Sequence, residues 1–336
     1  MRRFLPLVAL VAGCPSAPHF PETQPANACS VGAIQTGEQV LQLDVDGKMR
    51  QALVWMPEVE GPYTVLVNLH SFRSEPRRVA HYMKLVEWAK DKPVILVGAD
   101  GKTATWNAGE CCGKAAERGY DDVAFLDALV ERIDAVSCTN GEVVVSGLGN
   151  GAMMAHRWAC ESDTPDALLT AGGTLQMESC ARTTPLPVLH FHGDADEYAP
   201  LDGSGGHRPV EHGLAEWRRI NGVTSPPTEL SDGEMSCSLW SGAQPVSYCQ
   251  IAGGFNGWPG AADMPVNSML PFADATTAGL DWVDRALHPV ELAVPATPSA
   301  AVGADVEPVE AGGAAGATDE VQPALEAGVE HEEGAH

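Results

Sequence analysis

The stretch of sequence that decides the fold runs Ser146-Gly147-Leu148-Gly149-Asn150-Gly151-Ala152-Met153-Met154. It follows an apolar, strand-like run over residues 143–146 and opens a helical pattern over residues 151–160. Glycine adopts backbone conformations that other residues avoid, so the glycine-rich join allows a sharp turn. The sequence therefore predicts a buried strand that turns abruptly into a helix.

The same alternation of short strands and helices extends along the chain in both directions. Residues 121–136 give the clearest helix, since Val123, Leu126 and Leu129 follow the helical period and Asp121 stands near its start. Further strands are expected at residues 65–69, 93–97, 167–170, 188–191 and 247–251, and further helices at about 79–89, 210–220 and 275–287. This alternation predicts the α/β class, with a mainly parallel sheet covered by helices on both faces.

An antiparallel hairpin is expected ahead of these elements. Residues 40–45 and 51–56 alternate in polarity around Asp46-Gly47, which is a strong hairpin turn. The two strands would extend one edge of the sheet.

The charge balance separates the body of the chain from its end. The 336 residues carry 45 acidic and 20 basic side chains, so the formal net charge is −25. This excess argues against nucleic acid as a partner, because phosphate binding depends on clustered cations. Residues 289–336 hold no Lys, Arg or aromatic residue, and their Ala, Pro, Gly, Val and Glu cannot offset the entropy of ordering. They are predicted to form a disordered acidic tail.

The N-terminus has the pattern of an export signal. Arg2 and Arg3 precede an apolar run over residues 4–12, which is shorter than the ~20 residues that a membrane span needs. Small residues then lead directly into Cys14, as in a bacterial lipobox whose cysteine is lipidated. The alternative is an ordinary signal peptide cleaved nearby. Both readings predict export, either to the cell envelope as a lipoprotein (periplasmic or outer-surface) or into the medium.

The cysteines agree with an oxidising compartment. An even number follows Cys14, which permits up to four disulfides and 105 pairings. They are Cys29, Cys111, Cys112, Cys138, Cys160, Cys180, Cys237 and Cys249. The local pairs Cys237–Cys249 and Cys160–Cys180 are favoured, and the sequence leaves open how the other four cysteines pair. A zinc site is disfavoured, because no Cys-x-x-Cys spacing occurs.

The strand–turn–helix stretch at residues 146–154 is called the elbow below. Four more segments accompany it in a specific order along the chain. They are Trp106-Asn107-Ala108-Gly109-Glu110-Cys111-Cys112-Gly113, Asp121-Asp122-Val123, His190-Phe191-His192-Gly193-Asp194-Ala195-Asp196 and Gly253-Gly254-Phe255-Asn256-Gly257-Trp258-Pro259-Gly260. With these, the chain resembles the secreted α/β-hydrolases of the polyhydroxybutyrate depolymerase and feruloyl esterase type. The resemblance implies an α/β-hydrolase domain over residues 36–288, after a signal peptide (1–14) and a linker (15–35) and before the tail (289–336). It also implies carboxylic-ester chemistry without a cofactor.

The catalytic positions depart from that family. Gly149 stands where the family has its nucleophilic serine, and Asn256 stands where it has its catalytic histidine, while the acid is kept as Asp196. Glycine offers no nucleophile, and an amide does not exchange protons near neutral pH, so the serine–histidine relay is absent. Asn256 is expected to donate its amide N–H to Asp196.

Two other parts of the expected cleft are the oxyanion region and a pair of tryptophans. The oxyanion region follows His70 as Ser71-Phe72-Arg73-Ser74, whose bulk disfavours a preserved oxyanion hole, although the backbone N–H of Asn150 is kept. Trp106 and Trp258 are candidates for holding a small ester, polyester, glycan or aromatic ligand, with core packing as the alternative.

Replacement of the missing catalytic serine and histidine by other residues of the chain is disfavoured. Ser146 lies inside a strand end, and His207 and His212 lie at a helix start, where solvent is expected to surround them. His190 and His192 share a strand face as two metal ligands should, but no third ligand follows, so no metal is expected. We therefore expect an exported, degenerate or ligand-binding member of the family, with the membrane reached only through a lipid anchor. The alternative is an active carboxylic-ester hydrolase, polyester depolymerase or feruloyl esterase-like, with a rearranged site.

Overall fold

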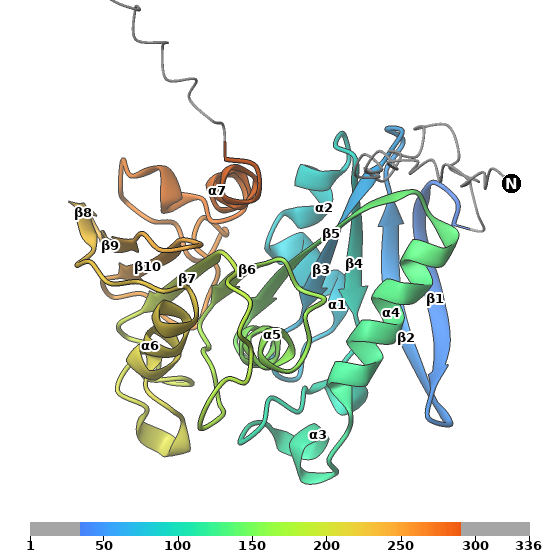
Figure 1. The fold of residues 1–336 in the computed structure, drawn as a ribbon, viewed down its shortest axis with the longest axis horizontal. Coiled ribbons are helices and arrows are strands. Elements are labelled where there is room, and N and C mark those ends of the chain that lie inside the picture. The colour runs from blue at the N-terminus through green and yellow to red at the C-terminus, as the bar shows by residue number, and fades with distance from the viewer. Residues whose placement is uncertain (1–33, 290–336) are drawn as a thin grey trace, which may run out of the picture. The chain divides into compact units, whose positions relative to one another are not determined.

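The computed structural model describes residues 34–289, in which one ten-stranded sheet runs through the middle (Figure 1). The strand order is β1-β2-β4-β3-β5-β6-β7-β10-β9-β8. The strands are β1 (Gly37–Val45), β2 (Lys48–Met56), β3 (Tyr63–Leu69), β4 (Val94–Ala99), β5 (Thr139–Leu148), β6 (Ala167–Ala171), β7 (Val188–Gly193), β8 (Thr228–Asp232), β9 (Met235–Trp240) and β10 (Val246–Ile251).

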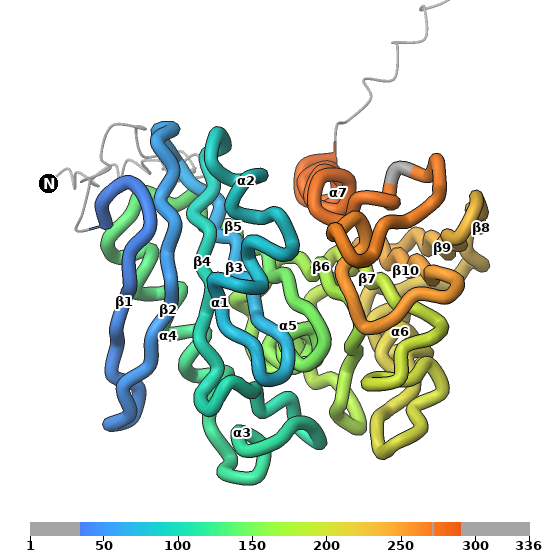
Figure 2. The backbone as a smooth tube through the Cα atoms, turned by 180° about the vertical axis from the view of Figure 1, so that it is seen from behind, coloured from blue at the N-terminus to red at the C-terminus, as the bar shows by residue number. Residues whose placement is uncertain are grey.

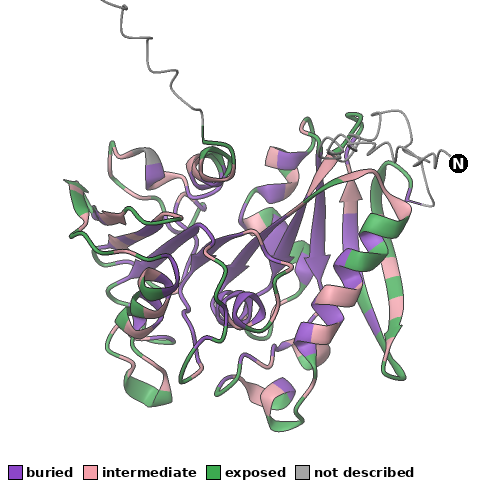
Figure 3. Cartoon of the chain, in the orientation of Figure 1, coloured by how far each residue is buried: buried purple, intermediate pink, exposed green. Residues whose placement is uncertain are grey.

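The centre of the sheet is parallel and its two edges are antiparallel. The neighbours from β4 through β3, β5, β6 and β7 to β10 all pair in parallel. The hairpin β1–β2 extends one edge, and β9 and β8 extend the other. The central strands are buried on both faces (Figure 3). The predicted fold class, a mainly parallel sheet with an N-terminal antiparallel hairpin, is confirmed.

Helices cover both faces of this sheet, and each face has its own apolar core. Figure 1 shows α4 (Asp122–Val136), α5 (Asn150–Glu161) and α6 (Val210–Ile220) on the near face. Figure 2, seen from behind, shows α1 (Pro76–Tyr82), α2 (Leu85–Ala89) and α7 (Thr277–Leu287) on the other. Consecutive strand residues serve opposite cores, because Val65 and Val67 pack with the first helix set and Leu66 with the second. This two-sided burial explains the continuous apolar runs.

Short helical turns complete the element list. They are α3 (Gly113–Glu117) and the 3₁₀ turns η1 (Lys102–Ala104), η2 (Ser204–Gly206) and η3 (Pro271–Ala273).

Two expectations about the elements are wrong. The helical stretch at 79–89 is interrupted, because Lys84 adopts a left-handed conformation (φ 56°) between α1 and α2. The strands β8 and β9 were not expected, since their sequences lack an apolar run. They form because β10 offers β9 a free edge and β9 in turn offers one to β8, and both pairings are antiparallel.

Three disulfides lie within residues 34–289. The predicted pairs Cys160–Cys180 and Cys237–Cys249 are confirmed, and the second joins residues directly opposite each other on β9 and β10. The third joins the adjacent residues Cys111 and Cys112. Cys138 is also disulfide-bonded.

The terminal predictions fall outside the described residues. They concern the signal peptide with Cys14, the linker up to residue 33, Cys29, and the tail from residue 290. Within residues 34–289, none of the helices has the length and hydropathy to cross a membrane.

The disulfides should differ in what they contribute to stability. A bond between residues 20 apart, as in Cys160–Cys180, constrains the unfolded chain by about 3 kcal/mol, whereas adjacent cysteines constrain it by only about 1 kcal/mol. We expect Cys160→Ala/Cys180→Ala to lose far more unfolding free energy in urea than Cys111→Ala/Cys112→Ala. Equal losses of unfolding free energy in the two double variants would contradict the expectation that the Cys111–Cys112 bond contributes little to stability.

Candidate functional site

The turn from β5 into α5 is built on a glycine in an unusual conformation. Gly149 has φ 56° and ψ −120°, a region in which a side chain is strained, and its N–H donates to the carbonyl of Ala171 at 2.9 Å. This is the sharp turn that the sequence predicts, and it presents residue 149 at the carboxyl end of the central strands.

Two side chains converge on the space beside Gly149. A Cβ atom added to this glycine would lie 2.8 Å from the Oγ of Ser71 and 3.0 Å from the Oδ1 of Asn256. The Ser71 hydroxyl, which comes from the loop after β3, therefore fills space that the side chain of a nucleophile at position 149 would need.

Asn256 is held by two acceptors. Its Nδ2 donates to the Oδ2 of Asp196 at 2.7 Å and to the carbonyl of Gly172 at 2.6 Å. The hydrogen bond expected between Asn256 and Asp196 is thus present. Gly172 permits this approach, because it has φ 62° and a Cβ there would lie 2.6 Å from Nδ2. The structure brings Gly149, Asp196 and Asn256 together.

These contacts fix which way the amide of Asn256 points. Both hydrogens of the NH₂ group are used by acceptors, and a flipped amide would set Oδ1 against two other oxygens. Oδ1 therefore faces Gly149 and Ser71. It can accept a hydrogen bond there but cannot donate one.

Asp196 is buried and fully partnered. Its Oδ1 accepts from the backbone N–H groups of Tyr198 and Ala199, each at 2.9 Å, and its Oδ2 accepts from Asn256 and lies 3.3 Å from the Nε2 of His192. Burial alone would raise the pKa of this carboxyl, but the hydrogen bonds from His192, Ala199 and Asn256 outweigh it and lower the pKa. The carboxylate stays charged at neutral pH although no imidazole stands beside it at position 256.

A chain of buried side chains leads from α6 to Asp196. The indole Nε1 of Trp217 lies 2.8 Å from the Nδ1 of His156, and the Nε2 of His156 lies 3.2 Å from the Oγ1 of Thr170. The Thr170 hydroxyl lies 2.9 Å from the Nδ1 of His190. The chain then continues from His190 Nε2 to His192 Nδ1 at 3.1 Å and from His192 Nε2 to the carbonyl of Ala199 at 2.7 Å.

The direction of every bond in this chain follows from its first member. An indole N–H can only donate, so Nδ1 of His156 accepts and its Nε2 carries the hydrogen. The same logic passes through the Thr170 hydroxyl to His190 and His192. All three histidines are therefore neutral with the hydrogen on Nε2, and the chain ends on the loop that carries Asp196. Sequence patterns gave no signal for it, because its members come from four elements.

The buried histidines make the fold sensitive to acid. Burial lowers the pKa of His156 to about 3 and that of His190 well below its usual range, whereas both would titrate near 6.5 in the unfolded chain. The unfolded state binds more protons below that value, so stability is lost as pH falls. We expect the free energy of unfolding to fall by about 1.4 kcal/mol per pH unit for each of the two below about pH 6. Urea titrations between about pH 7 and about pH 4.5 measure this slope.

Two matched variants test how much the buried hydrogen-bonded side chains contribute to stability. Thr170→Val keeps the shape but removes a donor and an acceptor, and should cost roughly 2 kcal/mol or more at neutral pH. Thr228→Val, on the exposed strand β8, should cost little. A stability that does not change over this pH range would contradict the assignment of neutral histidines.

The oxyanion region is anchored by Asn150 and His70. The side chain of Asn150 accepts from the backbone N–H of Trp106 at 2.7 Å and donates to its carbonyl at 3.1 Å. The Nε2 of His70 accepts from Gly101, and its Nδ1 lies 2.9 Å from the Ser71 carbonyl. Burial lowers the pKa of His70. Because α5 begins at Asn150, its first N–H groups have no partner inside the helix and face this region.

A cleft of about 770 Å³ opens above these residues. Its lining includes Gly149, Asn150, Asn256, Ser71 and Phe72, all predicted site residues. The Cys111–Cys112 bond and Met153 add apolar surface to it. The expected nucleophile, base and oxyanion positions therefore share one concavity, whereas Asp196 lies behind Asn256 and does not line it.

The aromatic residues of the cleft differ from those expected. Trp106 and Trp258 are 0% and 1% exposed, so the expectation that they face a ligand is wrong. Each indole is used inside the fold, with Trp106 donating to the carbonyl of His70 and Trp258 to the hydroxyl of Thr276. The exposed aromatic side chains at the cleft are Phe72, at 42%, and Tyr198, at 82%. An exposed aromatic inside a polar loop gives no periodic signal, and sequence reasoning missed Tyr198.

The structure also places the other residues that could have replaced the missing serine and histidine. Ser146 is buried and accepts from Asn68, away from the cleft. The expectation that solvent surrounds His207 is wrong, because this side chain is half-buried, lines the cleft and has a buried Nδ1 without a hydrogen-bond partner. His212 contacts the carbonyl of Met177 through Nε2.

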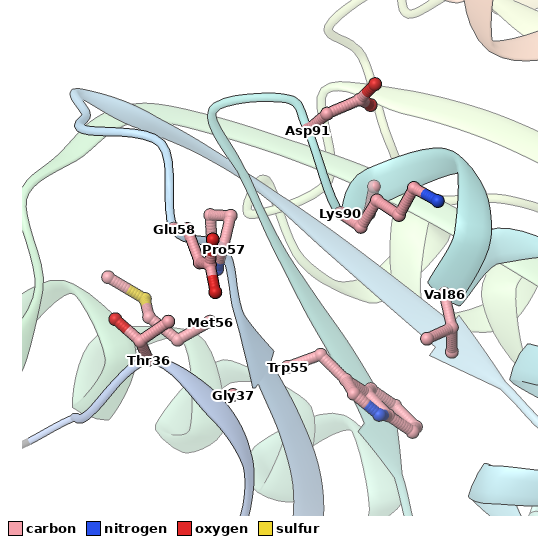
Figure 4. Close-up of a pocket in the computed structure, with 10 residues that line it drawn as sticks. Thr36, Gly37, Trp55, Met56, Pro57, Glu58, Val86, Lys90 and Asp91 are labelled. Carbon is pink, nitrogen blue, oxygen red and sulfur yellow. The ribbon is translucent and has the colours of Figure 1, made fainter.

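A second concavity lies away from this site. It measures about 470 Å³ and is mostly apolar. Figure 4 shows Trp55 from β2 and Val86 from α2 along it, with Lys90 and Asp91 at the end of α2. Among residues 34–289, its lining contains no serine, cysteine or histidine.

Neither concavity holds a metal-type cluster. Within residues 34–289, no group of three or more His, Cys, Asp or Glu side chains is arranged to bind a metal ion. The ring nitrogens of His190 and His192 are instead used in the buried chain.

Comparison with known proteins agrees with this architecture. No family model matches the chain. It is 24% identical over 216 residues to a probable feruloyl esterase C from Aspergillus niger, covering 60% of this chain and 73% of the relative. Among solved structures, the acetyl xylan esterase from Aspergillus awamori matches with a TM-score of 0.50 and 12% identity, over 67% of this chain and 96% of the other.

A thermostable esterase matches with the same TM-score and 13% identity, over 74% of this chain and 62% of its own. These likenesses extend over most of the domain. The chain has the α/β-hydrolase fold and is similar in sequence to feruloyl esterases. In this fold, a mainly parallel sheet places the nucleophile turn and the acid at the carboxyl ends of the strands, as β5 and β7 do with Gly149 and Asp196 here.

Proposed function

We propose that this chain is an exported, lipid-anchored esterase homologue that binds a ligand in its cleft without hydrolysing esters through a serine. The observation that carries the proposal is the amide of Asn256, which occupies the base position with its Oδ1 toward Gly149 and its NH₂ toward Asp196. Identity as a feruloyl esterase or polyester depolymerase homologue is part of the proposal and rests on the sequence motifs.

Residues 149 and 256 cannot carry out the attack and the proton transfer of serine-type ester hydrolysis. A general base must take a proton from the nucleophile near neutral pH, and an amide oxygen does not do so. Gly149 offers no atom to attack an ester carbonyl. In the subtilisin series, removal of the nucleophile or of the base costs about 10⁶ in turnover, and here both are absent.

The rest of the site supports binding. The cleft keeps about 770 Å³, Asp196 keeps four donors around it, and exposed aromatic side chains stand at the rim. A cavity of this size with a few convergent polar groups is typical of small-molecule sites. The cleft has not collapsed, and the carboxylate of Asp196 keeps its hydrogen bonds.

A working ester hydrolase with a rearranged site is the second candidate. Two observations favour it: the Oγ of Ser71 lies in the space of the missing nucleophile, and His207, whose buried Nδ1 has no hydrogen-bond partner, lines the same cleft. In that case Ser71 would be the attacking group and His207 its base.

Turnover of p-nitrophenyl acetate by the purified chain separates the two candidates. We expect no rate above the buffer control and no labelling by a fluorophosphonate probe, because no activated serine is present. Labelling at Ser71 that disappears in Ser71→Ala and His207→Ala would sink the proposal and establish the second candidate.

Restored chemistry should depend on three positions. Gly149→Ser/Asn256→His supplies a nucleophile and a base, but the new side chain meets the Ser71 hydroxyl 2.8 Å from its Cβ. We expect the triple variant with Ser71→Gly to exceed the double variant in turnover, and Ser71→Gly alone to stay silent. A double variant as active as the triple would show that Ser71 is no obstacle.

The anchor has its own test, on the full chain expressed in a bacterium. Cys14→Ser should release the protein from the membrane fraction, because each acyl chain contributes about 0.8 kcal/mol per buried methylene. Ser16→Ala, which leaves the lipobox intact, is the matched control and should stay bound. Mass spectrometry that finds an unmodified N-terminus in the wild type contradicts the anchor.

A further inference from the structure

We infer that the centre of the cleft is built to receive a hydrogen-bond donor, so its ligand is a ring-bearing alcohol bound through its hydroxyl group. This deepens the proposed function and rests on it, since it concerns the same cleft. An ester, whose oxygens only accept hydrogen bonds, is a poor fit at this point.

The first step is the fixed amide of Asn256. Its two N–H groups are taken by Asp196 and Gly172 at 2.7 and 2.6 Å, so only the Oδ1 acceptor is left to the cleft. That oxygen lies 3.0 Å from the position where a Cβ on Gly149 would stand. An imidazole there could change between donor and acceptor, whereas the amide cannot.

The second step is the hydroxyl of Ser71. Its Oγ lies 2.8 Å from the same position, and among residues 34–289 it has no hydrogen-bond partner. A hydroxyl both donates and accepts. An alcohol whose oxygen lies above Gly149, beyond contact with its Cα atom, can donate to Oδ1 of Asn256 and accept from Ser71, so that both of these polar groups are paired.

An ester in the same place leaves a mismatch. Its carbonyl oxygen can accept from Ser71 but sets a lone pair toward the Asn256 oxygen, which then loses water without gaining a donor. Sites that hydrogen-bond a ligand hydroxyl discriminate strongly against analogues that lack it. Because Asn256 is half-buried, we expect the cleft to bind the alcohol on the order of ten-fold more tightly than an analogue that lacks the hydroxyl.

The third step is the rim of the cleft. Phe72 and Tyr198 expose 42% and 82% of their surface beside the Ser71 and Asn256 pair. Their ring faces suit the flat face of a sugar or an aromatic ring. The shared chemistry is therefore a hydroxyl on a ring, which either a carbohydrate or an aromatic alcohol supplies.

Matched ligand pairs test this on the intact, unaltered protein. Saturation-transfer NMR titrations compare benzyl alcohol with benzyl methyl ether, and methyl β-D-glucopyranoside with its fully O-methylated form. We expect at least one alcohol to bind about ten-fold more tightly than its ether, and the pair that shows the gap identifies the source as aromatic or carbohydrate. An ether that binds as well as its alcohol in both pairs overturns the inference, as does failure of both alcohols to bind.

Variants assign the preference to the two groups. Asn256→Leu should lower the affinity for the alcohol several-fold without lowering that for the ether, because only the alcohol donates to Oδ1. Ser71→Ala should lower both affinities, because either ligand oxygen can accept from the Ser71 hydroxyl. Asn140→Leu, which alters an exposed amide on β5 outside the cleft lining, is the matched control and should leave both affinities unchanged. If Asn256→Leu does not fold, the ligand pairs on the unaltered protein still decide the question. Ester hydrolysis by the wild type would reject the proposed function, while the ethers, which cannot be hydrolysed, still report the donor preference separately.

Discussion

The paired hydrogen bonds of the Asn256 amide are the interaction on which the rest of the site depends. They join three loops that follow β6, β7 and β10, since Gly172, Asp196 and Asn256 lie in those loops. The NH₂ group donates to a buried carboxylate oxygen, and losing this donor would cost about 1–3 kcal/mol. Because both hydrogens are spent in this way, the oxygen that faces the cleft has a single role. The proposed loss of the catalytic base and the proposed polarity of the binding centre therefore have one cause.

The buried chain from Trp217 to His192 explains how the site tolerates that change. Asp196 is positioned by two backbone N–H groups and by His192, whose own orientation is set by His190 and Thr170. None of these groups depends on the residue at position 256. Gly149, in turn, holds its positive φ more easily than a serine would. The frame of an esterase can thus persist without its chemistry.

The sequence predicts the fold well where elements are buried on both faces and poorly where they are not. The runs around Val65 and Leu189 are apolar because both faces of their strands are covered, and they are found directly. The strands β8 and β9 form at an exposed edge through backbone pairing, which leaves no apolar pattern. The replaced catalytic positions are visible from motifs, whereas the Ser71 hydroxyl beside Gly149 is not, because segments nearly 80 residues apart meet only in the fold. The two tryptophans show the limit of composition, since burial and exposure of an indole look alike in a sequence.

The orientation of the Asn256 side chain tests this account most directly. NMR of the ¹⁵N-labelled, protonated protein, with the side-chain amide of Asn256 assigned by comparison with Asn256→Leu, resolves its two hydrogens. We predict that both exchange slowly with solvent and show nuclear Overhauser effects to Gly172, because both are held by Asp196 and the Gly172 carbonyl. Fast exchange of either hydrogen, or contacts from the NH₂ group to the β-protons of Ser71, would mean that the amide points its donors into the cleft and would contradict the account.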